Sequence, residues 1–445
     1  MNNLGKLTPD ITRIVKSKDS RFKTVRYSGI ILNTESDLQY PLRFLNTVEI
    51  LSDYNGKYTD FVLISTVIPL GDFVKVLNPL KDNLDIRLTK ESGSIKVRDT
   101  MKLTILSADA SAESGDYSNK SRDDLNKEGM VNIEFQCINR VAFILRMAYS
   151  QAIYHDCRLK DAIYFSYNEL ISKTTIDGKP LDVDIKIDTP DNNRVYHHIE
   201  VPNNVDLMNM PTSIQNGDYG LYNGDIGTYL NKAVVEYKKD PSEEEYKDTL
   251  WVYPLYKKIE ENVKTKEMFV YAANMLLSDL TEYTYLNSKD RLEIIVNENS
   301  TIIDERSKNT LNYGAGFTAM KADSILKRKQ NFDSKNITLS RDDTTMDQSI
   351  KSRNDGLDYS ANKGISDNMY VERSKLLKDN AMPMQFKWNY SRPELIEPDM
   401  VLTYIYIDKT NTIKRVRGNV QSVFTIYNND KKMSSSLVNV TLTDI

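Results

Sequence analysis

The chain contains only three histidines, and their spacing suggests one possible metal site. His198 and Glu200 stand two residues apart, which would place both side chains on one face of a strand, as metal ligands require. Beyond the adjacent His197, the only other histidine is His155, so a full ligand set is not apparent. We therefore favour a pair of surface histidines flanking a turn, and we assign no metal ligand.

The two cysteines, Cys137 and Cys157, are the only candidate nucleophiles of their kind. Cys157 lies two residues from His155, but catalysis needs a base within hydrogen-bonding distance and a third group that orients it. Neighbourhood in sequence does not supply that geometry, so we expect buried or half-buried thiols. Two cysteines are also too few for a disulfide framework or a structural zinc site, which indicates assembly in a reducing compartment.

Three further patterns have an ordinary structural explanation. Three aspartates alternate with apolar residues and fit the solvated face of a strand better than a carboxylate or metal site. Four glycines at short spacing suggest a phosphate loop, but Asp218 and Asp225 would repel phosphate and no GK[ST] follows. Acidic residues after Pro241 predict the first turn of a helix. The aspartates are Asp182, Asp184 and Asp188, the glycines are Gly217, Gly220, Gly224 and Gly227, and the acidic residues after Pro241 are Glu243, Glu244 and Glu245. We assign no catalytic or cofactor-binding residue and predict a protein that is not an enzyme.

Composition narrows the function classes. The 445 residues include 59 basic and 63 acidic side chains, a net charge of −4, which disfavours sequence-specific DNA binding. Tyrosine suits surfaces that are partly buried and partly solvated, and it is enriched at protein interfaces, so the 27 tyrosines favour a component of a larger assembly. The amino terminus shows no apolar signal core, and Arg146 interrupts the apolar run from Val141 to Ala148, so we predict no membrane span.

The last fifty residues predict a β-meander. Val401 to Ile407 is apolar or aromatic on both faces, as expected of a strand buried on both sides. Lys414 to Tyr427 alternates, with Val416, Val420, Phe424 and Ile426 expected to share the core face. Turns at Asp408 to Asn411 and at Asn428 to Asp430 lead into a third strand around Leu437.

The first third has the same character. Strand-like runs occupy Arg21 to Asn33, Leu42 to Ser52, Phe61 to Thr66, Ile95 to Ser107 and Val131 to Cys137. Pro69 begins a short helical pattern that ends before Asn78-Pro79, and Ala108 to Gly129 has the composition of a long exposed hairpin loop.

The middle of the chain mixes both periods. Arg140 to about Ser172 changes to a helical period, Leu181 to Asp188 returns to alternation, and Pro202 to Leu230 is rich in turns. Trp251 to Tyr256 and Arg291 to Val296 are expected strands. Residues 299–369 are polar, and we expect 335–367 to be a long insertion that orders on a partner.

These patterns predict a β-rich α+β protein of three domains. We expect a tube-like β-barrel domain at 1–140, an α/β insertion domain at 141–265, and a second tube-like β-barrel domain at 266–445 carrying the polar insertion at about 299–369.

The order of parts resembles the baseplate hub proteins of contractile-tailed, T-even-type bacteriophages. Four regions carry the likeness: Phe61 to Thr89, Met101 to Tyr149, Pro202 to Tyr256 ending in WVYPLY, and Met382 to Leu442 with the lead-in PELIEPDMVL. One departure is Glu397-Pro398-Asp399, which stands where the family commonly has a Pro-Gly pair. The 335–367 insertion is also longer than a minimal hub needs.

The resemblance implies a structural virion protein of the tail baseplate, assembled in the host cytoplasm. It implies two antiparallel barrels similar to the tail-tube subunit and a homotrimer whose six barrels join a threefold central spike to the sixfold tail tube. Tube-initiator, baseplate wedge and tape-measure proteins would be further partners, and DNA would pass through the lumen during ejection. Two alternatives stay open: another baseplate or tail-tip component, such as a wedge or tube initiator, and the hub part of a tail-associated cell-wall hydrolase.

Overall fold

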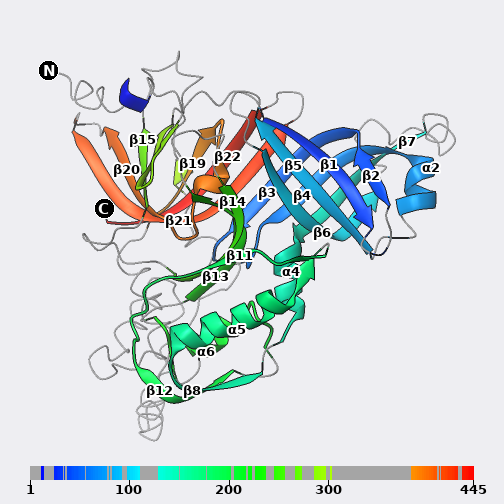
Figure 1. Cartoon of the computed structure of the whole chain (residues 1–445). Coiled ribbons are helices and arrows are strands. Elements are labelled where there is room, and N and C mark those ends of the chain that lie inside the picture. Colours follow the sequence, from blue (N-terminus) through cyan, green and yellow to red (C-terminus); the bar gives the residue numbers. More distant parts are fainter. Residues whose placement is uncertain are drawn as a thin grey trace, which may run out of the picture.

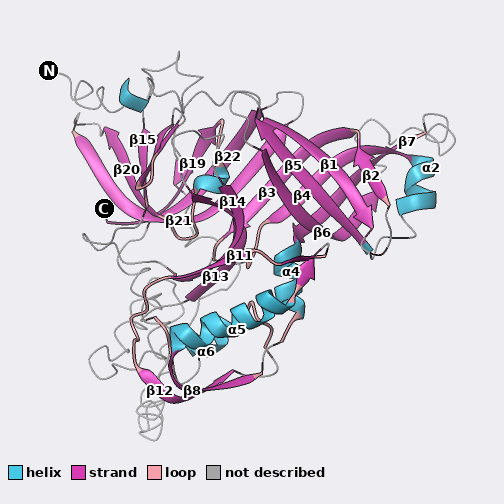
Figure 2. Cartoon of the chain, viewed as in Figure 1, coloured by secondary structure: helices cyan, strands magenta, loops and turns pink. Residues whose placement is uncertain are grey.

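Strands dominate the computed structural model, and two curved β bodies lie side by side above a mixed helical and sheet layer (Figures 1 and 2). This is the β-rich α+β class expected from the sequence. The structure describes residues 12–14, 25–33, 35, 38–55, 57–77, 80, 83–92, 98–110, 129–149, 151–176, 178–201, 205–216, 219–222, 226–236, 245–255, 266–272, 285–296, 301–302, 382–407, 410, 412–428 and 433–444. Of the loop predicted at Ala108 to Gly129, residues 108–110 instead continue strand β6, and residues 111–128, like the polar insertion at 335–367, lie outside the described residues.

The first β body is a curved antiparallel sheet in the order β3-β4-β7-β6-β5-β1-β2. Residues of β1 and β4 alternate between buried and more exposed, so one face of the sheet forms a core. The sheet curls until β1 and β2 approach β3 and β4. Its strands are β1 (Val25–Asn33), β2 (Gln39–Leu42), β3 (Phe44–Asp53), β4 (Phe61–Pro69), β5 (Leu84–Ser92), β6 (Arg98–Ala110) and β7 (Met130–Asn139).

The second β body closes in a similar way but contains parallel pairs. β15 runs parallel to both β17 and β20, whereas the sequence predicted antiparallel barrels throughout. β17 approaches β19, and Tyr285 packs edge-on against Trp388 with ring centres 5.7 Å apart. Its strands are β15 (Glu267–Ala272), β16 (Tyr285–Asn287), β17 (Arg291–Val296), β18 (Thr301–Ile302), β19 (Met382–Asn389), β20 (Val401–Ile407), β21 (Ile413–Asn428) and β22 (Met433–Asp444).

One strand, β21, belongs to both bodies (Figure 1). Residues 413–419 pair with β20, and residues 422–428 pair with β3. Because β22 pairs along the opposite edge, β20 and β3 follow one another on the same edge of β21. The two bodies are therefore joined by continuous backbone hydrogen bonding.

A β-bulge in β21 corrects the predicted burial of this strand. Two consecutive residues of β22, Val440 and Asn439, pair with Val420 and Ser422 of β21, so Gln421 is an extra residue without a partner position in β22. Val416 and Val420 are buried as predicted, but Phe424 is only half-buried and Ile426 is exposed, and Val423 and Tyr427 are buried instead. The extra residue shifts the alternation by one, so the buried residues change from even-numbered positions before the bulge to odd-numbered positions after it.

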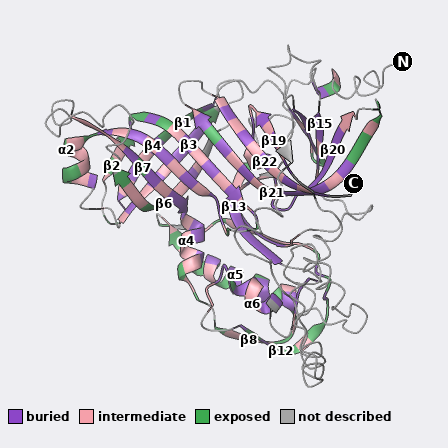
Figure 3. Ribbon diagram, turned by 180° about the vertical axis from the view of Figure 1, so that it is seen from behind, coloured by how far each residue is buried: buried purple, intermediate pink, exposed green. Residues whose placement is uncertain are grey.

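The middle of the chain forms a separate layer on β13 (Ile226–Glu236) and β14 (Glu245–Pro254). Tyr229 and Trp251 point into the core of the β bodies, whereas Leu230 and Leu250 belong to the core beneath the helices. β13 is accordingly buried along most of its length (Figure 3). Its helices and remaining strands are α4 (Arg140–Met147), β8 (Ala152–Arg158), α5 (Leu159–Lys173), β9 (Thr175–Ile176), β10 (Lys179–Pro180), β11 (Val183–Ile187), β12 (Val195–Val201) and α6 (Met210–Asn216).

The helical segment predicted from Arg140 to Ser172 is in fact two helices with a strand between them. Asn139 caps α4 by accepting a hydrogen bond from the Val141 amide at 2.8 Å. β8 then pairs with β12, and α5 follows immediately. Of the predicted helix start at Glu243, Glu244 and Glu245, the first two residues lie outside the described part of the chain, and Glu245 begins strand β14, where it pairs with Glu236 of β13. The short helical pattern after Pro69 appears as α2 (Leu70–Asp72) and the π-helical turn η2 (Phe73–Leu77).

The division into three domains at residues 140 and 265 remains a prediction. Among the described residues, the two larger hydrophobic cores are nevertheless distinct, since one spans both β bodies and the other takes its buried residues from Val141 onwards.

Candidate functional site

The cysteines occupy positions that do not suit nucleophilic chemistry. Cys137 is completely buried in β7, and burial raises the pKa of its thiol far above the ordinary value. Cys157 is half-buried in β8, where burial and then Asp161 and Asp156 raise its pKa. A raised pKa keeps a thiol protonated and therefore weakly nucleophilic.

The aspartates and glycines singled out in the sequence do not converge. Asp182 forms an ion pair with Lys247, and Asp184 lies within the half-buried strand β11. Gly220 adopts a left-handed φ of 62°, as a turn residue does, and Gly227 lies inside strand β13 against the ring of Tyr253. Gly217, Gly224, Asp218 and Asp225 lie outside the described residues.

The histidines are brought together in a way that the sequence did not predict. His197 and His198 lie within strand β12 and do not flank a turn, although both are exposed as expected. His155 stands directly opposite His198 on the neighbouring strand β8. Within the described ranges, no group of three or more His, Cys, Asp or Glu side chains could hold a metal ion.

A buried ion network ties the two β bodies to the middle layer. The Lys90 ammonium of β5 donates to both carboxylate oxygens of Glu394 at 3.1 and 3.0 Å, and Arg392 Nε donates to the same carboxylate at 3.0 Å. Arg392 also donates to the Tyr246 hydroxyl on β14. Lys90 and Arg392 are 6% and 1% exposed. Burial alone would raise the pKa of Glu394, but the charges of Lys90 and Arg392 lower it to about 2.

A second buried polar cluster joins β3 and the segment just before β4 to β13. Asp60 Oδ1 accepts hydrogen bonds from Ser52 Oγ at 2.6 Å and from the Tyr229 hydroxyl at 2.8 Å. Thr59 donates to the backbone oxygen of Leu230 at 2.7 Å, which ties the same two segments together. Burial raises the pKa of Asp60 to about 6, although the Ser52 and Tyr229 hydrogen bonds act in the opposite direction. These two clusters fix the relative positions of the layers.

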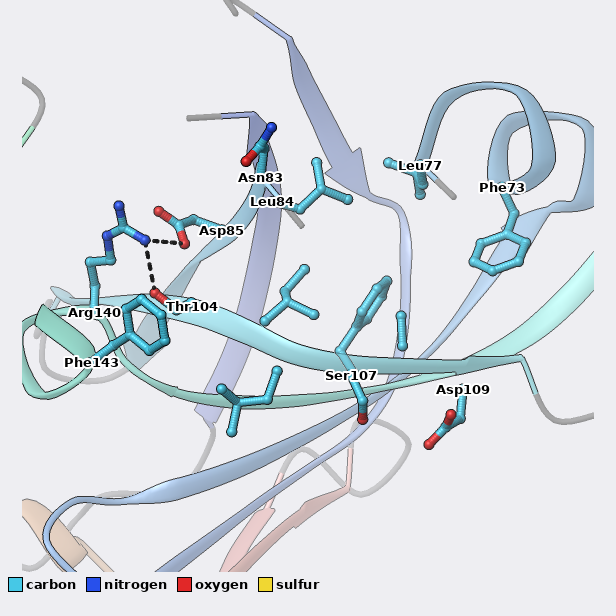
Figure 4. A pocket seen from close by; sticks show the side chains of 14 residues that line it. Phe73, Leu77, Asn83, Leu84, Asp85, Thr104, Ser107, Asp109, Arg140 and Phe143 are labelled. Atoms are coloured by element: carbon cyan, nitrogen blue, oxygen red, sulfur yellow. Dashed lines mark hydrogen bonds and ion pairs between the residues drawn. The ribbon is translucent and has the colours of Figure 1, made fainter. Parts of the chain in front are cut away.

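A cavity of about 500 Å³ opens in the first β body (Figure 4). At one end Arg140 donates to Asp85 at 3.3 Å and to Thr104 at 3.2 Å. Within the described part of the chain, Arg140 Nε and Ser107 Oγ are buried without a hydrogen-bond partner. The cavity could therefore accept an apolar group that carries a hydrogen-bond acceptor. Its lining is Phe73, Leu77, Asn83, Leu84, Asp85, Thr104, Ile105, Leu106, Ser107, Ala108, Asp109, Phe135, Arg140 and Phe143.

The large sheet has two ends that are potential surfaces for assembly. Its path of paired strands runs from β16 to β2 among the described residues. Pro41 lies in β2 and blunts that edge, because proline has no amide hydrogen to donate. Exposed apolar side chains also lie on the first body, with Phe44 54% and Leu106 50% exposed. These features suit protein contacts better than small-molecule chemistry.

None of the helices in the described part of the chain is long and apolar enough to cross a membrane.

Comparisons with known proteins gave matches only among solved structures. No family model matches the chain, and no curated protein matches it. It is similar to the tail protein from Neisseria meningitidis MC58, with 11% identity, a TM-score of 0.44, and coverage of 93% of this chain and 96% of that one.

Two further solved structures show similar values. The E. coli c3393 protein, a component of the type VI secretion system with structural similarity to T4 bacteriophage tail proteins gp27 and gp5, has 8% identity and a TM-score of 0.40, with 94% of this chain and 76% of that chain covered. The 43 kDa tail protein of prophage MuSo2 from Shewanella oneidensis has 8% identity and a TM-score of 0.39, with 94% and 100% covered. The structures that this chain is similar to thus include phage tail proteins, the class that its sequence resembles.

Proposed function

We propose that this chain is the structural hub of a phage tail baseplate. Three copies form a ring in which six β bodies surround a channel and adapt a threefold central spike to the sixfold tail tube. The observation that carries this proposal is that one chain contains two curved β bodies held together by the single strand β21. A protein that presents two fixed copies of a similar surface turns threefold symmetry into near-sixfold symmetry.

The internal rigidity of the chain supports this role. An adapter must hold its two ring-forming bodies at a constant angle, because a closed ring tolerates little variation between neighbouring contacts. The continuous ladder of β21 and the buried Lys90–Glu394–Arg392 network both resist a change of that angle. The proposed role needs no catalytic residue.

The proposed partners follow from the same ring. The hub would contact its own copies, the spike, the tube or tube-initiator protein, and baseplate wedge proteins, within the virion tail. DNA and the tape-measure protein would pass through the lumen. The net charge of −4 supports a channel that does not retain polyanions, since phosphate binding depends on neutralisation by Lys and Arg.

The first test is the mass of the purified protein in solution, with images of negatively stained particles. The proposal predicts a particle of three times the chain mass of 51.2 kDa, with a central hole and a six-lobed outline. A stable monomer, even when mixed with the spike protein of the same tail, would exclude a self-assembled hub and favour a peripheral baseplate component.

A pair of variants tests whether the contacts between copies in the ring are formed by the β bodies. The double variant Phe44→Glu with Leu106→Glu places charges on exposed apolar positions of the first body. It should weaken the trimer, so the mass measured in solution should fall towards that of one chain. Phe165→Glu is the matched control, since Phe165 is 52% exposed but lies on α5 in the middle layer. Loss of the trimer in the Phe165 variant alone would place the contacts on the middle layer and contradict a ring built from the β bodies.

A cell-wall hydrolysis assay with the wild-type chain should show no activity, which separates the hub from a tail-associated hydrolase.

A further inference from the structure

All three histidines of the chain lie on one two-stranded ribbon, formed by β8 and β12 below the helices of the middle layer (Figure 1). His155 is 42 residues from His197 in sequence and 43 from His198, so only the fold brings them together. All three side chains are exposed to solvent.

The ribbon is anchored firmly to the layer above it. Ile199 and Val201 are buried in the core beneath the helices. The hydroxyls of Tyr154 and Ser166 are 2.8 Å apart, and Tyr196 packs edge-on against Tyr219 with ring centres 5.2 Å apart. Side chains on the outer face of the ribbon are therefore held on a fixed backbone.

His155 and His198 form a cross-strand pair on this ribbon. They are direct partners in the antiparallel register, and their ring centres lie 4.9 Å apart with the ring planes at 82°. Two imidazole nitrogens at adjacent corners around a metal, each about 2.1 Å from it, place the ring centres about 5 Å apart. The observed separation matches the spacing that a shared metal ion needs.

We propose that His155 and His198 together bind one divalent transition-metal ion of the nickel, copper and zinc group. Neutral imidazole suits these ions, and copper is bound most tightly in the usual order. The two rings supply two ligands, and the remaining positions hold water or a group from another protein. The open positions make this an exchangeable surface site and not a closed structural one.

His197 provides a matched control on the same ribbon. Its Nδ1 lies 2.6 Å from Asp156 Oδ1, and its side chain is 95% exposed. It is exposed, as the pair is, but it is engaged with a carboxylate and is not paired with another histidine across the strands.

The test is a calorimetric titration of the full chain with Zn²⁺, and separately with Ni²⁺, at pH 7.5. We expect one ion per chain. His155→Ala and His198→Ala should each weaken binding by about tenfold or more, since losing a ligand costs at least as much as losing an outer partner of a ligand. His197→Ala should bind as the wild-type chain does.

Two outcomes would overturn the proposal. One is the absence of saturable binding, and the other is an equal loss in the His197 variant, which would indicate only nonspecific surface histidines. A circular dichroism spectrum of each variant shows whether the chain is still folded. The oligomeric mass is measured in the same samples without metal, so failure of this site and failure of the trimer are read separately.

Discussion

The buried ion network at Glu394 gives a sharp test of how the layers are held together. In the variant Lys90→Met, a methionine of similar length replaces the lysine that donates both hydrogen bonds to the Glu394 carboxylate. The carboxylate, whose side chain is 10% exposed, then keeps only Arg392 as a charged partner. The variant therefore leaves a buried charge poorly compensated.

The size of the effect follows from the pKa of Glu394. Its fall from 4.5 to about 2 means that the folded protein favours the ionised carboxylate by about 3 kcal/mol, at about 1.4 kcal/mol per pKa unit. Breaking a buried ion pair by removing one partner costs a similar ~3–5 kcal/mol. We expect Lys90→Met to lower the free energy of unfolding by about 3 kcal/mol, or the urea midpoint by about 1 M for a slope of ~3 kcal/mol per M.

The pH dependence supplies an independent check. Because the folded-state pKa of Glu394 is depressed, its contribution to stability is present above about pH 4.5 and is lost as the pH falls towards 2. Wild-type stability should therefore decline over that window, and the decline should be smaller in Lys90→Met. The assay is urea unfolding followed by tryptophan fluorescence at pH 7 and at pH 3.

Two further variants make the interpretation specific. Lys173→Met removes an exposed ion pair with Glu169 at 2.7 Å and should cost only about 0.3–0.5 kcal/mol. Glu394→Gln removes the negative charge but keeps an oxygen that can accept from Arg392 Nε, so Lys90→Met should cost less in the Glu394→Gln background than in the wild type. If Lys90→Met shifts the midpoint no more than Lys173→Met does, the network does not hold the layers together and this reasoning is refuted.

Other predictions concern single positions. Burial raises the pKa of Asp60 to about 6, so the folded protein favours the protonated carboxyl, and wild-type stability should fall by about 3 kcal/mol as the pH rises from 4 to 7. Asp60→Asn should flatten this part of the pH profile of stability, and an unchanged profile would contradict the prediction. Asp399 has a left-handed φ of 54°, and its Oδ2 accepts a hydrogen bond from Asn419 Nδ2 at 3.3 Å. Asn tolerates this backbone and keeps a side-chain oxygen, so Asp399→Asn should change the melting temperature little while Asp399→Val lowers it clearly; equal melting temperatures would show that the backbone is not strained. A Cβ on Gly418 would lie 2.1 Å from the Thr441 carbonyl oxygen, so Gly418→Ala should cost about 1–3 kcal/mol, whereas Gly71→Ala, with open space around it, should not destabilise the chain in the same urea assay.

The sequence was most informative where one face of a strand is buried. The predicted runs at Phe61, Val131, Arg291 and Val401 became strands β4, β7, β17 and β20, because alternation or a fully apolar run states directly how a strand is buried. Asp399 lies at the Glu397-Pro398-Asp399 departure, and its positive φ explains why a glycine suits this position.

Features that depend on distant partners could not be predicted in the same way. Nothing within Glu267–Ala272 indicates that β15 runs parallel to both neighbours, because strand direction is set by the connections. β8 was hidden in a helical period, since its pairing with β12 overrides local preference. The pairing of Lys90 with Glu394 and of His155 with His198 spans long stretches of chain that no local pattern connects.

The bulge at Gln421 explains how one strand can serve two β bodies. A regular strand that extends from one curved sheet into another would keep every second residue buried along its whole length. The extra residue shifts the alternation by one and increases the local twist, so Val420 before the bulge and Val423 after it are both buried. Tyr427 then packs edge-on against Tyr27 of the first body, with ring centres 4.7 Å apart. The way the two bodies are joined is therefore built into the register of β21 itself, and the hub that we propose would repeat this joint three times around its ring.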